Sequence, residues 1–130
     1  MKQIQSIAAP AGRILLSLMF VTSGFSKISG YTATQGYMEA MGVPAMLLPL
    51  VIAVELLGGL AVMLGWHTRI AAFLLAGFSL LSALLFHANF GDQMQMIMFM
   101  KNISIAGGFL MIVALGGGAY ALDNRSKNGL

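Results

Sequence analysis

The stretch AMLLPLVIAVELLGGLAVML at residues 45–64 contains a single ionisable side chain, Glu55. About 20 predominantly apolar residues are enough for a helix to cross a bilayer, so this stretch predicts a membrane span with one acid inside it. Similar windows lie at residues 12–28, 69–90 and 94–115. Four spans leave no room for a soluble domain, so we expect residues 1–130 to form one membrane domain. The predicted fold class is all-α, an integral membrane four-helix bundle.

The composition supports this assignment and excludes several functions. Charged residues make up 8% of the chain and hydrophobic residues 58%, whereas about 25% of a soluble domain is charged. The chain has no cysteine, which excludes disulfides, thiolate metal sites, iron–sulfur clusters and catalytic thiols. Two histidines and four carboxylates offer few ligand sets, and we expect no metal site. The net charge of +3 comes from scattered cations without a basic patch, so we expect no nucleic-acid partner.

The distribution of cations predicts the orientation. An even number of spans places both termini on one side of the membrane. That side would carry five cations and the other side two, which marks the termini as cytoplasmic, N-in and C-in. The five are Lys2, Arg13, Arg69, Arg125 and Lys127, and the two are Lys27 and Lys101.

The connections between spans predict helix ends. Residues 32–41 read as a short interfacial helix between the first two spans, with Thr32 as its N-cap. Gly42 and Pro44 follow in the order that ends a helix. Asp92 and Gln95 form a capping-box pattern that starts the last helix near residue 93. The glycines at 116–118 end that helix.

Two charged residues lie deep in the predicted spans. A helix that begins at residue 93 places Lys101 and Asn102 about 12 Å below the outer surface, and Glu55 lies about 15 Å below the same surface. A charge within a span costs about 2.5–3.5 kcal/mol on insertion scales. Matching depth and opposite charge therefore predict an ion pair between Glu55 and Lys101.

These residues define a candidate site. We expect Glu55, Lys101 and Asn102 to line one buried pocket that opens to the outer side, with other polar residues at its mouth. The alternative is that the ion pair only fixes helix register. Gly58 and Gly59 either let two helices approach closely or leave room for a flat ligand ring. The candidate ligand-binding residues are Lys27, Glu55, Gly58, Gly59, His87, Asn89, Lys101 and Asn102, and the catalytic candidates are Glu55, His87 and Lys101.

Two arginines are interpreted differently. Arg13 and Arg69 lie near the cytoplasmic ends of their spans. Long basic side chains at this position commonly reach the lipid phosphates and anchor the topology. We expect both to do so.

The order of short motifs resembles a known family. Matching segments occur from Arg13 to Asp123, nearly the whole chain, and as a set they are specific. They are Gly24-Phe25-Ser26-Lys27, Tyr37 to Pro44, Glu55-Leu56-Leu57-Gly58-Gly59, Thr68-Arg69, Phe86-His87-Ala88-Asn89-Phe90, Phe99-Met100-Lys101-Asn102 and Gly118-Ala119-Tyr120. On these residues the chain resembles the DoxX family of small four-span membrane proteins.

The resemblance implies a bacterial inner-membrane protein related to quinol oxidase subunits. Members of the family are linked to thiosulfate:quinone oxidoreduction and to membrane complexes that handle thiol or oxidative stress. Fold carries over between relatives better than chemistry does. The resemblance therefore raises the expectation of a redox role without defining the reaction.

Three functions follow from the residues and the resemblance together. The first is a quinone- or quinol-interacting redox protein or subunit, with ubiquinone or menaquinone as a non-covalent ligand and no covalent cofactor. Lys101 and Asn102 would donate hydrogen bonds to the quinone, and Glu55 or His87 would exchange protons. The second is a non-catalytic anchor that docks a partner oxidoreductase subunit. The third is a small transporter, which would need a homo-oligomer to enclose a path.

Overall fold

The computed structural model describes residues 2–86 and 91–125, and the regular structure in them is entirely helical. The helices are α1 Lys2–Ser29, α2 Tyr31–Ala40, α3 Leu48–Leu64, α4 Thr68–Phe86 and α5 Gln93–Leu115, with 3₁₀ turns η1 Ala45–Leu47 and η2 Leu122–Arg125. Four of these helices are long and apolar enough to cross a membrane. The predicted all-α membrane four-helix bundle is confirmed.

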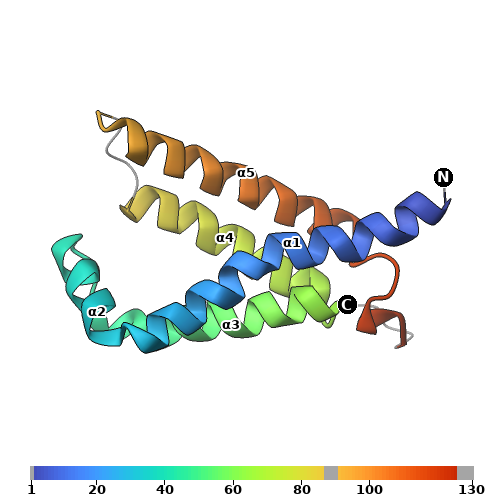
Figure 1. Cartoon of the computed structure of the whole chain (residues 1–130), viewed down its shortest axis with the longest axis horizontal. Helices are drawn as coiled ribbons and strands as arrows, with labels where there is room; N and C mark the ends of the chain where they lie inside the picture. Colours follow the sequence, from blue (N-terminus) through green and yellow to red (C-terminus); the bar gives the residue numbers. More distant parts are fainter. Residues whose placement is uncertain (1, 87–90, 126–130) are drawn as a thin grey trace.

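The spans form two pairs (Figure 1). Helix α1 lies along α3, and α4 lies along α5, while the contact between α3 and α4 joins the pairs. The start of α1 and the turn η2 lie at one end of the bundle, and α2 lies at the opposite end (Figure 1). We call these the terminal end and the α2 end.

The first two helices begin and end differently from the prediction. Helix α1 starts at Lys2 and continues through Pro10, ten residues before the predicted span at 12–28, because hydropathy marks the apolar part of a helix and not its length. Helix α2 has Gly30 as its N-cap without a side-chain hydrogen bond, so the cap predicted at Thr32 is wrong. A single residue separates α1 from α2, so Thr32 already lies in the first turn.

Other helix ends follow the predicted local chemistry. The backbone N–H of Val43 donates to the carbonyl of Met38 at 2.8 Å across Gly42, whose φ of +78° favours glycine. The Asp92 carboxylate accepts from the N–H of Met94 at 3.0 Å and caps α5. Gly116 ends α5 with a φ of +83°. The capping predictions at these positions are confirmed.

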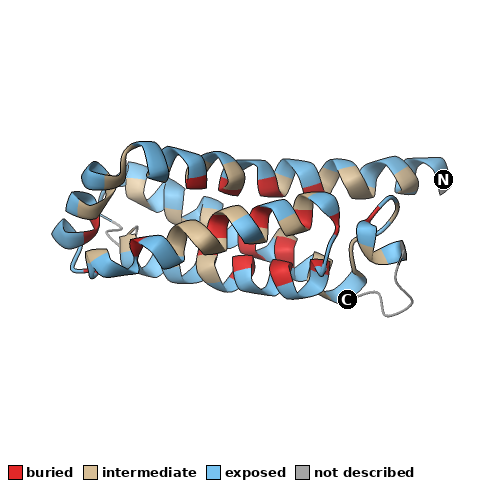
Figure 2. Ribbon diagram, turned by 90° about the horizontal axis from the view of Figure 1, so that it is seen from below, coloured by how far each residue is buried: buried red, intermediate tan, exposed pale blue. Residues whose placement is uncertain are grey.

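An aromatic contact ties α1 to the opposite pair of helices. The Phe20 ring meets that of Phe109 on α5 edge-on at a centroid distance of 5.5 Å, and that of Phe78 on α4 at 6.2 Å. Small and branched side chains from α3, α4 and α5 complete this buried cluster. Figure 2 shows that buried residues concentrate toward the middle and terminal end of the bundle.

A second, smaller cluster holds α2 in place. Met38, Val43 and Leu48 are buried together, and the ring of Tyr37 stacks on that of Phe86 at the end of α4 with centroids 5.5 Å apart. Helix α2 therefore packs across the ends of the spans through apolar contacts.

Two glycines on α3 allow close packing. A Cβ added at Gly59 would lie 3.0 Å from Val21 Cγ2 and 3.3 Å from Phe20 Cβ, both on α1. A Cβ at Gly58 would lie 3.2 Å from the Leu75 side chain on α4. The space beside these glycines is thus filled by neighbouring helices, which favours close approach over room for a ligand ring.

The packing at Gly59 generates a first prediction. Gly59→Val should lower the free energy of unfolding by about 1–3 kcal/mol, because the added methyl groups overpack the α1–α3 contact. The matched control is Gly77→Val on α4, where nothing lies within 4 Å of an added Cβ. Denaturation with sodium dodecyl sulfate in mixed micelles measures both variants. Equal losses would show that helix propensity, not packing, causes the effect.

Candidate functional site

A buried ion pair lies between α1 and α3. Glu55, in the middle of α3, is 2% exposed, and its carboxylate accepts a hydrogen bond from the ammonium group of Lys27 in the last turn of α1. Lys27 Nζ also donates to Ser23 Oγ at 2.8 Å. The result is a chain of three polar side chains within an apolar contact.

Local geometry explains why these residues meet. Ser23 and Lys27 are four residues apart and therefore share a face of α1. A Cβ added at Gly24, between them, would lie 2.5 Å from Leu56 Cγ, so α1 and α3 pack closely at this level. Side chains on a helix lean toward its N-terminus, and this lean turns Lys27 back into the bundle toward Glu55.

The predicted pair between Glu55 and Lys101 is wrong. Lys101 is exposed on α5, a helix that packs mainly on α4, and within the described part of the chain Lys101 has no ion pair. Depth along a span fixes the level of a side chain but not the direction in which it points. Glu55 points toward α1, where Lys27 lies.

The other candidate residues are distributed as follows. Asn102 is half-buried on α5, and Gly58 and Gly59 pack against neighbouring helices. His87 and Asn89, predicted at the mouth of the pocket, lie outside the described residues. The structure therefore brings together Lys27 and Glu55 among the candidates, and it adds Ser23, which the sequence reasoning missed.

The ion pair offsets the cost of burying a charge between α1 and α3. A lone charge in this apolar contact would carry a large desolvation penalty, which a hydrogen-bonded partner of opposite sign offsets. The Lys27 side chain is 27% exposed, against 3% for Glu55. An ammonium group has three N–H donors, and Ser23 and Glu55 use two of them. Lys27 can therefore offer one further hydrogen bond.

A buried hydroxyl lies at the same level on α4. Ser79 is 2% exposed, and its Oγ has no hydrogen-bond partner among the described residues. Leu75, one turn earlier, packs on Gly58. Ser79 lies four residues after Leu75, a rise of about 6 Å along α4, and Glu55 lies three residues before Gly58, a rise of about 4.5 Å along α3. Because α3 and α4 run antiparallel, both rises are in the same direction. Ser79 and Glu55 thus occupy matching levels on facing helices.

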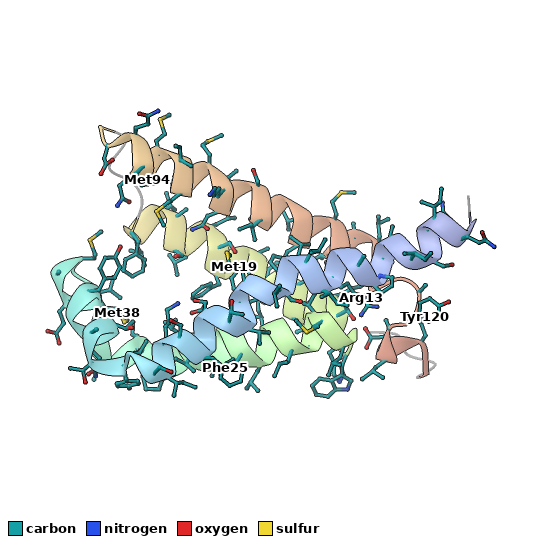
Figure 3. All side chains as sticks on the ribbon, in the orientation of Figure 1. Arg13, Met19, Phe25, Met38, Met94 and Tyr120 are labelled. Atoms are coloured by element: carbon teal, nitrogen blue, oxygen red, sulfur yellow. The ribbon has the colours of Figure 1, made fainter. Side chains whose placement is uncertain are left out.

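A second polar network closes the terminal end. Arg13 is 3% exposed, and its guanidinium donates to the carbonyls of Met63 at 3.2 Å and Ala119 at 3.0 Å. Figure 3 shows Arg13 at the same end of the bundle as Tyr120. The prediction that Arg13 reaches the lipid phosphates is wrong, because the last carbonyls of α3 need donors and Arg13 supplies them. Arg69 is exposed, and its anchoring role stays a prediction.

The segment after α5 returns to cap α4. The Asp123 carboxylate accepts from the backbone N–H groups of His67 at 2.6 Å and Thr68 at 2.9 Å, and from Thr68 Oγ1 at 2.5 Å. Its own N–H donates to the carbonyl of Gly65 at 2.8 Å. Partial burial acts to raise the pKa of the Asp123 carboxyl, but the hydrogen bonds from Thr68 and His67 outweigh it and hold this pKa below its ordinary value. The network therefore favours the ionised carboxylate.

Comparison with known proteins identifies relatives. Residues 8–88 match the DoxX family. "Inner membrane protein YqjF" of Escherichia coli (strain K12) is 50% identical over 123 residues, which cover 95% of each chain. "Inner membrane protein YphA" of the same strain is 38% identical over 120 residues, 87% of this chain and 86% of that one.

A more distant relative carries a functional name. "Putative oxidoreductase CatD" of Bacillus subtilis (strain 168) is 33% identical over 64 residues, 49% of this chain and 48% of that protein. No solved structure matches the chain.

The ion pair generates a second prediction. Lys27→Met should lower the free energy of unfolding by about 3 kcal/mol, because it leaves Glu55 buried without its partner. The double change Lys27→Met/Glu55→Met should recover most of that loss. Lys101→Met is the matched control and should stay within about 0.5 kcal/mol of the unchanged chain, since its side chain is exposed. Denaturant titration in detergent measures all three, and a wild-type value for Lys27→Met would contradict the buried pair.

The Asp123 network generates a third prediction. Because its folded pKa lies below the unfolded value, Asp123 stabilises the fold above the unfolded carboxyl pKa of about 3.9, and this contribution is lost as the pH falls through the folded pKa. Asp123→Asn should lower the free energy of unfolding at neutral pH by about 1 kcal/mol, because hydrogen bonds to a charged acceptor are stronger than those to a neutral amide. It should also flatten the acid limb of the stability profile. Unfolding measured from pH 7 to pH 3 tests this. Thr68→Val should give an intermediate profile, and an unchanged acid limb in Asp123→Asn would reject the assignment.

Proposed function

Since the chain belongs to the DoxX family, we propose that it is a quinone-interacting redox protein of the bacterial inner membrane, or a subunit of one. The observation that carries the proposal is the buried pair of Lys27 and Glu55. Ionisable residues inside a membrane span commonly mark a functional site. The two side chains are also unequally exposed, because Lys27 remains partly accessible while Glu55 is buried.

The chemistry of the pair fits a quinone head group. Reduction of a quinone to a quinol takes two electrons and two protons, and the head group needs a donor for a carbonyl oxygen. The free N–H of Lys27 can supply that donor, and Glu55 behind it can exchange a proton through Lys27. The electrons would come from a partner subunit or from a diffusible reductant such as a thiol or thiosulfate.

The relatives support this proposal. Two relatives are named inner membrane proteins, and the distant relative bears the name "Putative oxidoreductase CatD". The cation distribution supports cytoplasmic termini. In that orientation the site lies in the outer half of the membrane.

An alternative function is a non-catalytic subunit that docks a partner oxidoreductase. The observation that favours it is the exposure of α5. All residues of this helix, 93–115, are described, and the buried ones among them are Ala106 and Phe109. In this case the buried pair would serve only to hold α1 against α3. The two functions predict different effects of a conservative change at Glu55.

The test of the proposed function is quinone-analogue binding. Glu55→Gln should weaken binding of a short-chain ubiquinone or menaquinone analogue about tenfold, because it removes the charged partner that orients Lys27. The matched control is Glu39→Gln, whose carboxyl is exposed on α2 and whose change should leave affinity unaltered. Equilibrium binding to protein in lipid nanodiscs measures both. Retained affinity in a folded Glu55→Gln variant would favour the docking subunit instead.

A further inference from the structure

A trough runs along the exposed side of α5. It consists of a shallow hollow of about 610 Å³ and an adjoining one of about 340 Å³ against α1, and Ile105 lines both. The first hollow is lined by Met96, Ile97, Met100, Lys101, Ser104 and Ile105. Its walls are apolar except for Ser104 and the exposed ammonium side chain of Lys101. We call these two hollows the α5 trough.

Lys101 creates an unbalanced charge in this trough. It lies eight residues, about 12 Å, beyond the start of α5, on a helix long and apolar enough to cross the membrane. In the described part of the chain no acid pairs with it. A cation at this depth is costly in lipid and pairs with a counter-charge. Lipid tails can fill an apolar trough, but their phosphates lie at the surface and not at this level.

The described residues offer no acid for this position. Its four carboxylates are all described: Glu55 is buried with Lys27, Asp123 caps α4 at the terminal end, and Asp92 caps the start of α5. Glu39 lies on α2 beyond the ends of the spans. A second copy packed symmetrically on the trough would bring two lysines together. Charge complementarity therefore argues for a different occupant.

We propose that the α5 trough docks a transmembrane helix of a partner protein, and that this helix carries an aspartate or glutamate paired with Lys101. The apolar wall accepts the apolar side chains of such a helix. Ser104, small and one turn from Lys101, permits close approach of the two backbones. Ile97, Lys101 and Ile105 follow at spacings of four residues, so they present one continuous stripe about 12 Å long. This proposal does not rest on quinone chemistry at Glu55.

The experiment uses the full chain and a host peptide in phosphatidylcholine vesicles. The peptide is a single apolar span of about 20 residues with one glutamate about 12 Å from its end, and a matched peptide has glutamine there. Energy transfer between labelled protein and peptide reports association. The glutamate peptide should bind the wild-type chain about tenfold more tightly than the glutamine peptide, a difference of about 1.4 kcal/mol.

Variants separate the charge from the trough. Lys101→Met should abolish the difference between the peptides, and Lys101→Arg should retain it. Lys101→Glu should reverse it, so that a peptide carrying lysine binds instead. The control Leu57→Lys/Lys101→Met moves the cation to an exposed face of α3, where Leu57 is 69% exposed, and should bind the glutamate peptide more weakly than wild type does.

Three outcomes would overturn the proposal. Equal binding of both peptides to the wild-type chain would show that Lys101 reaches the membrane surface. Self-association of labelled chains that is lost in Lys101→Met would identify a second copy as the occupant. Displacement of the glutamate peptide by phosphatidylglycerol would identify an anionic lipid. These readouts are independent of quinone binding, so failure here leaves the proposed function untouched.

Discussion

The absence of water inside a bilayer is the constraint on which this structure depends. A charged or polar group in a membrane span is costly unless it finds a partner. Glu55 meets this requirement through Lys27, and Lys27 through Ser23 as well. The pair joins the last turn of α1 to the middle of α3. A shift of one helix along the other would therefore leave the buried Glu55 without its partner. Close packing at Gly24 and Gly59 joins the same two helices.

The same constraint acts on the helix ends. The end of α3 and the start of α4 expose carbonyl and N–H groups that have no partner in their own helices. Arg13, from α1, serves the carbonyls, and Asp123, from the segment after α5, serves the N–H groups. The terminal end is thus closed by residues far apart in sequence. The pair at Glu55 holds the middle of α3, and the network of Arg13 and Asp123 holds its C-terminal end.

Sequence could predict what depends on near neighbours along the chain. Hydropathy located the spans, and the capping of α5 at Asp92 and its end at Gly116 followed from local backbone chemistry. Contacts between helices could not be predicted in this way, because hydropathy and depth give the level of a residue but not the direction in which its side chain points around the helix axis. For this reason depth predicts Lys101 as the partner of Glu55, whereas the partner in the structure is Lys27. The roles of Arg13 and Asp123 depend on carbonyl and N–H groups about 50 positions away, and nothing in local sequence indicates them.

Lys27 and Lys101 show how one physical rule supports two different proposals. In α1 and α5, whose residues are all described, each is the only lysine of the half nearer the α2 end, and each faces the cost of a cation among apolar side chains. Lys27 meets that cost through Glu55 and retains one N–H donor, and the proposed quinone binding rests on this donor. Lys101 has no counter-charge among the described residues, and the proposed docking of a partner helix rests on this. Glu55 and Lys101 lie on different helices, α3 and α5, so the proposed ligand binding and the proposed docking can be tested by separate substitutions.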